Sequence, residues 1–207
     1  DTLSLHDALP ISQSTSGNRP TFSGAGVMFN AASSQWLQLN TTYASTHSIY
    51  IVATPTSASS VYLFGRSSPA GAPTMIINYT GTSLEYYPAN DGSTRSTYGS
   101  PTSTFIASYV RTYGSGVIGR LNGSQVISTG SPTSEPSTVA WGNLGRSGSD
   151  TNYYTGTIYE FMIFNTALTT TQCQQIEGYL AWKWNLSTTL ATAHPFEDKP
   201  PYAQPFL

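Results

Sequence analysis

Short apolar runs separated by glycine, proline, serine and asparagine recur from Thr21 to Phe164, with a spacing of about ten residues. This spacing is typical of antiparallel strands joined by tight turns. The sequence predicts strands at Val27–Phe29, Gln35–Leu39, Ser48–Thr54, Val61–Gly65, Met75–Tyr79, Ser83–Tyr87, Thr104–Arg111, Val117–Leu121, Gln125–Ser128, Val139–Gly145 and Thr157–Phe164.

The dipeptide Asn122-Gly123 lies between two of these strands. Both residue types tolerate a positive φ, as a two-residue hairpin turn requires. The fold class that follows is all-β: an antiparallel jelly-roll β-sandwich with one short C-terminal helix and extended terminal arms.

The helix is predicted near 169–184. Thr169 and Gln172 have the spacing of a capping box, and Leu168 fits the hydrophobic staple that accompanies it. Asn185 is a suitable residue to end the helix. The apolar stripe of this helix is Cys173, Ile176, Leu180 and Trp184, recurring at helical spacing.

The chain divides into an N-terminal arm (1–20), a sandwich with its helix (21–190) and a proline-rich tail (191–207). The tail is expected to run extended over a surface. The first twelve residues, DTLSLHDALPIS, also resemble a translated sequencing-adapter read-through. The arm has Leu3, Leu5, Leu9 and Ile11 at odd-numbered positions, which lie on one face of an extended chain. Such an arm could add as a strand to the edge of a sheet. We favour exchange of this arm between subunits, giving a homo-oligomer or filament, over folding back on its own sandwich.

Charged residues make up only 9% of the 207 residues, and the net charge is −2. No basic cluster exists that would track a phosphate backbone, so no nucleic-acid partner is expected. No apolar run has the length of a membrane span. The single cysteine, Cys173, has no partner for an intrachain disulfide. A hydroxyl-rich surface of low charge suits an extracellular protein or a virion surface.

From Gly26 to Phe196 several segments have the pattern of one family. They are GVMF, QWLQL, RLNGSQV, GNLGR, YYTGTIYEFMIFNTALT, QIEGYLAWKW and the later HPF. Together they resemble the laminin-G-like branch of the concanavalin A-like lectin/glucanase superfamily, in the form seen in viral and environmental sequences. The resemblance implies a jelly-roll sandwich whose relatives bind glycans or proteins, or serve as structural modules.

No catalytic constellation is recognisable. Glycoside hydrolysis needs two carboxyls a few ångströms apart, and the ten carboxylates form no cluster along the sequence. There is no nucleophile elbow of the G-x-S-x-G type. His6, His47 and His194 are scattered, so a zinc site is not expected. We therefore predict a non-enzymatic protein with no catalytic or metal-binding residues and no cofactor.

Calcium is the one metal that could contradict the prediction of no metal site, because members of the resembled superfamily bind it. Asp150 and Asn152, beside Asn143, could donate oxygens from one loop end, and Asp91 next to Asn90 is a second candidate. Both segments also have the composition of ordinary turns, and the turn interpretation is the one we favour.

A sugar site would need exposed aromatic rings with polar neighbours. The candidate ligand-binding residues are Tyr86, Tyr98, Trp141, Tyr153 and Tyr154. The candidate glycosylation sites, each an Asn-x-Ser/Thr sequon, are Asn40, Asn78, Asn122 and Asn185.

Three functions remain open at this point. The first is a structural, self-assembling surface protein of a virion or an extracellular filament, connected through its arms. The second is a monomeric carbohydrate- or receptor-binding module. The third, with the weakest support, is a glycan hydrolase.

Overall fold

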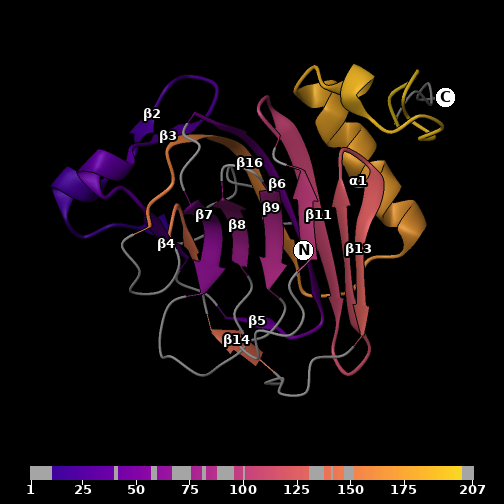
Figure 1. The fold of residues 1–207 in the computed structure, drawn as a ribbon, viewed down its shortest axis with the longest axis horizontal. Helices are drawn as coiled ribbons and strands as arrows, with labels where there is room; N and C mark the ends of the chain where they lie inside the picture. The colour runs from indigo at the N-terminus through magenta and orange to yellow at the C-terminus, as the bar shows by residue number, and fades with distance from the viewer. Residues whose placement is uncertain are drawn as a thin grey trace, which may run out of the picture.

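The molecule consists of two antiparallel sheets, A and B, packed face to face, and one helix packs against the outer face of sheet A (Figure 1). The computed structural model describes residues 11–39, 42–56, 60–66, 76–80, 83–87, 96–99, 101–130, 138–140, 142–146 and 152–201. The predicted all-β sandwich is confirmed. Within these ranges no helix is long and apolar enough to cross a membrane.

Each sheet has seven described strands. Sheet A has the order β13 (Ser124–Gly130), β12 (Gly116–Leu121), β11 (Phe105–Thr112), β6 (His47–Pro55), β16 (Gly156–Phe164), β3 (Val27–Phe29) and β2 (Thr21–Phe22). Sheet B has the order β1 (Ile11–Ser12), β4 (Leu37–Leu39), β15 (Gly142–Leu144), β7 (Ser60–Arg66), β8 (Ile76–Thr80), β9 (Ser83–Tyr87) and β10 (Ser96–Gly99). A separate pair joins β5 (Thr42–Ala44) to β14 (Thr138–Ala140).

The central strands of sheet A, β11, β6 and β16, are buried on both faces. On β6, Ile49 and Ile51 point into the core between the sheets, whereas Tyr50 and Val52 pack beneath the helix. Strand residues alternate between faces, so a strand covered on both sides has apolar residues at every position. This double burial explains the uninterrupted apolar run of the sequence at β6.

A β-bulge at Tyr159 turns one charged side chain away from the core. The register of β16 on β6 shifts between Ile158 and Glu160. Ile158 packs in the core between the sheets, and without the bulge Glu160 would have the same parity and point there too. Instead Glu160 Oε2 accepts hydrogen bonds from Lys183 Nζ at 2.6 Å and Trp184 Nε1 at 3.1 Å. Glu160 therefore has a structural role, joining β16 to the end of the helix through a lysine and a tryptophan.

Helix α1 (Thr170–Lys183) has the predicted capping box, with Thr169 as N-cap and Gln172 at N3. Its C-terminal end also follows the prediction, because Asn185 has a φ of 57°. Leu180 is fully buried against sheet A, whereas Ile176 is only partly buried. The helix is thus fixed by its caps, its apolar stripe and the Glu160 contacts.

The C-terminal tail does not run extended as predicted, because its polar groups close local turns. After the short helix η3 (Ser187–Thr189), residues 191–201 form turns beside α1. His194 N donates to Ala191 O at 2.9 Å, and Glu197 N donates to His194 O at 3.1 Å. Trp182 Nε1 donates to Phe196 O at 2.9 Å, so the tail is held on the helix.

The predicted strand Val139–Gly145 is wrong as one element. It divides into β14, which pairs with β5, and β15, which lies between β4 and β7 in sheet B. Strands β1, β2, β5 and β10 were not predicted at all. They have two to four residues each, too few for an alternating pattern to be recognised.

The N-terminal arm contacts its own chain where it is described. Ile11 and Ser12 pair with Leu39 and Gln38 of β4. This is the fold-back arrangement, which we had ranked below exchange between subunits. The other arm residues, Leu3, Leu5 and Leu9, lie outside the described residues.

Candidate functional site

Of the five predicted sugar-stacking residues, only Tyr153 and Tyr154 have described side chains. Tyr86 and Tyr98 belong to the neighbouring strands β9 and β10, where Tyr86 pairs with Ser96 and Tyr98 with Leu84. The structure describes the backbone of these two tyrosines but not their side chains, and Trp141 lies outside the described residues. Tyr153 is half-buried.

Tyr154 is a correction. Its side chain is fully buried in the core between the sheets, where its ring lies 6.0 Å from that of Phe29. Gly156 packs closely against it, since a Cβ on Gly156 would stand 2.5 Å from the Tyr154 hydroxyl oxygen. A ring enclosed in this way has no free face for a sugar, so the prediction of Tyr154 as a stacking residue is wrong.

The sequon asparagines have different surroundings. Asn122 Oδ1 accepts from Ile106 N at 2.9 Å, and Asn122 O accepts from Ala191 N at 2.9 Å. Its turn, with φ of 47° at Asn122 and 79° at Gly123, is the predicted hairpin turn and supports the tail. Asn185 is exposed. The side chain of Asn78 and the whole of Asn40 lie outside the description.

The calcium candidates are only partly described. Asp150, Asp91 and Asn90 lie outside the described residues. Asn143 is fully buried on β15, paired in register with Gln38 and Gly65, and its side-chain amide has no hydrogen-bond partner among the described residues. Asn152 is exposed. Within the described ranges no three His, Cys, Asp or Glu side chains are grouped as metal ligands.

A buried polar cluster beneath α1 unites residues that no sequence motif singled out. Ser108 Oγ donates to Glu177 Oε1 at 3.0 Å, His194 Nε2 lies 3.4 Å from Glu177 Oε2, and Arg120 Nε lies 4.0 Å from Glu177 Oε1. The four side chains are buried. The carboxylate of Glu177 lies between Ser108 and His194. In the described contacts, therefore, the imidazole of His194 does not reach the Ser108 hydroxyl to act as its base. The cluster joins β11, β12, α1 and the tail.

Cys173 is a core residue of the same region. It is buried and free, and burial raises the pKa of its thiol above the ordinary value. A protonated, enclosed thiol is a poor nucleophile. The structure thus confirms the expectation that Cys173 packs on the helix stripe.

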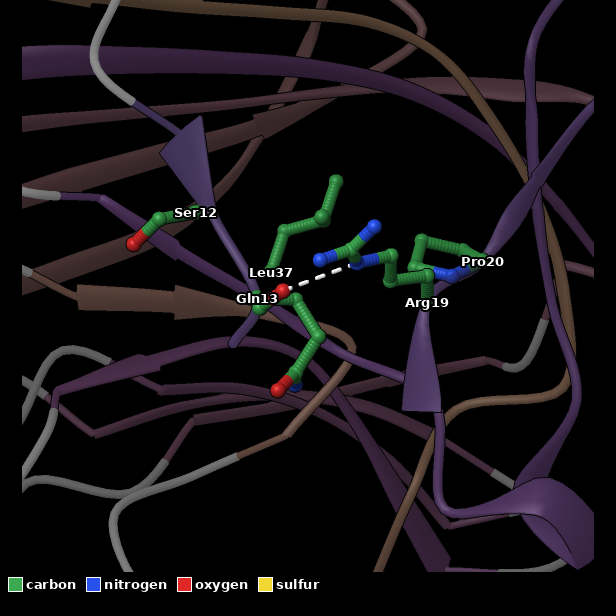
Figure 2. Close-up of a pocket in the computed structure, with 5 residues that line it drawn as sticks. All are labelled: Ser12, Gln13, Arg19, Pro20 and Leu37. Atoms are coloured by element: carbon green, nitrogen blue, oxygen red, sulfur yellow. Dashed lines mark hydrogen bonds between the residues drawn. The ribbon is translucent and has the colours of Figure 1, made fainter. Parts of the chain in front are cut away.

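A recess of about 410 Å³ lies at the open edge of the sandwich, where the chain crosses from β1 of sheet B to β2 of sheet A (Figure 2). Ser12, Gln13, Arg19, Pro20 and Leu37 line it. Its volume is within the range of about 300–1,000 Å³ that is usual for small-molecule sites. Strands β2, β3 and β4 lie on the side of the molecule away from α1 (Figure 1).

Arg19 is the charged residue of the recess and is fixed by backbone contacts. Its Nε donates to Gln13 O at 2.9 Å, and its own carbonyl accepts from Gln35 Nε2 at 2.9 Å. Gln13 is in turn held, because its Nε2 donates to Trp36 O at 3.3 Å and its Oε1 accepts from Thr15 N at 3.0 Å. Among the described residues Arg19 has no carboxylate partner, so both of its terminal amino groups remain available as donors.

An exposed aromatic ring lies close to the recess along the chain. Phe22 is 68% exposed and lies two residues beyond Pro20 on the extended chain, so these two residues share one face. Phe22 pairs with Val27, which packs against the core. Met28, 43% exposed, pairs with Thr21 and so lies on the opposite face of the same edge.

A second, smaller groove of about 220 Å³ lies over β11, β12 and β13. Its lining residues are Val110, Thr112, Ser115, Gly116, Val117, Ile118 and Ser128. None is charged or aromatic, so the recess at Arg19 offers more specific recognition chemistry.

Comparisons with known proteins define the fold. No protein-family model matches the sequence, and a search of curated proteins finds no match. Among solved structures, one similar chain is the binding domain of Paraclostridial Mosquitocidal Protein 1, with a TM-score of 0.61, 8% identity, and coverage of 83% of this chain and 48% of that one. The fold is that of an antiparallel β-sandwich.

Two further structures support this conclusion. Domain 4 of AbnA, a GH43 extracellular arabinanase from Geobacillus stearothermophilus in complex with arabinotriose, has a TM-score of 0.52 and 16% identity, covering 71% of this chain and 73% of that one. Trypanosoma rangeli sialidase has a TM-score of 0.58 and 10% identity, covering 79% of this chain but only 28% of the sialidase. Identities this low show the fold and not the ligand.

Sequence reasoning missed the recess. Its residues come from β1, the loop before β2, and β4, so no local motif contains them. One signal was present: Arg19 is the only charged residue between Asp7 and Arg66, and no carboxylate occurs between Asp7 and Glu85. A lone cation in a long stretch without acids is a candidate for recognising a ligand.

Proposed function

We propose that this chain is a non-enzymatic, laminin-G-like module of an extracellular protein, and that it binds glycan in the recess at Arg19. The observation that carries the proposal is the guanidinium of Arg19 in the recess, held by Gln13 O through its Nε, with the exposed ring of Phe22 three residues further along the chain. Saccharide sites combine donors for hydroxyl groups with an apolar surface for the ring.

The solved structures support this proposal in two ways. The AbnA domain was determined with arabinotriose, and the mosquitocidal-protein domain is a binding domain. Both have the sandwich architecture seen here. The extracellular setting of the arabinanase agrees with the low-charge, hydroxyl-rich composition of this chain.

Self-assembly, as part of a virion surface or an extracellular filament, is the second candidate. The exposed side chains of Phe22 and Met28 on an edge of sheet A favour it, because open strand edges invite pairing with another chain. The in-chain pairing of Ile11 and Ser12 with β4 counts against the N-terminal arm as connector.

Hydrolysis has the least support. Glu160 and Glu177 are buried in ion pairs with other elements. Glu197 and Asp198 lie in the tail, where Glu197 Oε2 accepts from Ala193 N at 3.2 Å. None of these four carboxylates lines the recess.

The test compares two exposed apolar residues on one strand pair. Binding to a glycan array is measured for the wild-type protein, Phe22→Ala and Met28→Ala, with hits confirmed by calorimetry. We expect Phe22→Ala to lose binding by tenfold or more, which corresponds to about 1.4 kcal/mol, and Met28→Ala to bind as wild type. Light scattering on the same samples reports assembly. Absence of binding by the wild type, or equal losses in the two variants, would reject the recess as a glycan site.

A further inference from the structure

The described residues around the recess carry positive charge and no acidic side chain. Arg19 is the only charged residue in the described segment 11–39, although the chain as a whole has a net charge of −2. Arg146 adds a second cation nearby, stacked 3.3 Å above the ring centroid of Trp36, the residue before Leu37 in the recess. A neutral sugar would not need this charge.

The guanidinium is positioned as well as charged. Its Nε is already used by Gln13 O, which sets the plane of the group and leaves the two terminal nitrogens for a ligand (Figure 2). An arginine fork of this kind matches the two oxygens of a carboxylate. The apolar side chains of Leu37 and Pro20 beside it reduce the screening of that interaction by water.

We propose that the ligand of this recess is a saccharide bearing a carboxylate, with the carboxylate on the terminal amino groups of Arg19 and the sugar ring toward Phe22. This inference rests on the proposed glycan-binding function and adds the charge of the ligand. An acidic peptide offers the same carboxylate, but its flexible side chain presents no rigid ring to stack on Phe22.

The experiment uses pairs of ligands that differ only in charge. Affinities are measured by calorimetry for oligogalacturonate and its methyl ester, and for sialyllactose and its methyl ester. Wild-type protein should bind the acidic member of at least one pair tenfold or more tightly. Arg19→Gln should remove this preference, because it lowers the affinity for the acidic member by more than it lowers the affinity for the neutral member. Arg19→Lys should keep a reduced preference, since its single ammonium lacks the fork.

Lys199→Gln is the matched control, because it removes one positive charge in the tail, away from the recess. It should leave the preference within twofold of wild type. Two results would overturn the inference and leave the glycan-binding function standing. The first is equal affinity for both members of both pairs, and the second is a preference for the acidic member that persists in Arg19→Gln. Failure to bind any member of either pair, together with a negative array, would overturn both proposals. Binding of a Glu-rich peptide more tightly than any acidic saccharide would assign the recess to a protein partner instead.

Discussion

Gly178 of α1 and Phe196 of the tail pack without room for a methyl group between them. A Cβ built on Gly178 would stand 2.6 Å from Cβ and 2.8 Å from Cγ of Phe196. The glycine is therefore a docking position for the tail, although glycine inside a helix costs about 1 kcal/mol relative to alanine. The same tail residue accepts the hydrogen bond from Trp182.

Gly178→Ala should lower the free energy of unfolding by about 1 kcal/mol. Overpacking costs about 1–3 kcal/mol, and the better helix propensity of alanine returns about 1 kcal/mol. In a Phe196→Gly background the clashing atoms are gone, so the same substitution should stabilise by about 1 kcal/mol. Chemical denaturation of the four proteins measures both values, and the same sign in both backgrounds would contradict the docking role.

Lys183→Met should destabilise the protein by about 2–3 kcal/mol, because it leaves the buried carboxylate of Glu160 without its cation. This cost is below that of breaking a fully buried ion pair, because the lysine is partly exposed to water. Burial lowers the pKa of Lys183, but its bond to Glu160 outweighs that effect and keeps the pKa above the ordinary value. Lys199→Met, an exposed control, should change stability by less than about 0.5 kcal/mol. Equal effects of the two substitutions in urea unfolding would argue that the pair is not structural.

Acid should destabilise the fold through His47. Burial, and to a smaller degree the charge of Arg111, lower the pKa of His47 to about 4. The unfolded chain, with an ordinary pKa of about 6.5, binds the proton first, so the stability due to neutral His47 is complete above pH 6.5 and is lost as pH falls toward 4. The slope approaches about 1.4 kcal/mol per pH unit.

His47→Asn retains a donor toward Ala44 O, which accepts from His47 Nδ1 at 2.6 Å. This variant should therefore show a shallower decline between pH 6.5 and 4 in stability measured by urea unfolding. An unchanged slope would place the acid sensitivity in other groups.

Leu180→Ala should cost about 2–5 kcal/mol, as expected for a fully buried leucine. Ile176→Ala should cost less, about 1–2 kcal/mol, because Ile176 keeps part of its surface in water. Gln175→Ala, exposed on the same helix, is the control and should have little effect. Thermal melts in which Ile176→Ala costs as much as Leu180→Ala would revise this account of the helix face.

The elements that could be predicted are those defined by neighbouring residues. Strands Val27–Phe29 and Ser83–Tyr87 have their predicted bounds, and the helix has its predicted capping box, because alternation and capping are local patterns. The division of Val139–Gly145 into two strands could not be predicted in this way. It depends on pairing partners far away in the sequence, β5 for one half and β4 and β7 for the other.

The candidate site depends on the same kind of distant contact. Gln13, Arg19 and Leu37 belong to different segments, and only the crossing between the two sheets brings them together. Tyr154 shows the opposite error. Adjacent tyrosines on an extended chain predict one ring on each face, and the buried ring here is that of Tyr154, whereas Tyr153 is half-buried.

The position of β16 has a consequence for how the chain reaches its native state. This strand is the last of the described strands in the sequence, yet it lies in the interior of sheet A, between β6 and β3. During synthesis β6 can pair with β11 early, whereas β3 lacks its central neighbour until β16 has left the ribosome. Closing such a long loop before its contacts form is entropically costly, which places the protein among slow, topology-limited folders. The unfinished sheet would meanwhile expose an unpaired apolar edge, so a delay in elongation before β16 should favour aggregation of nascent chains.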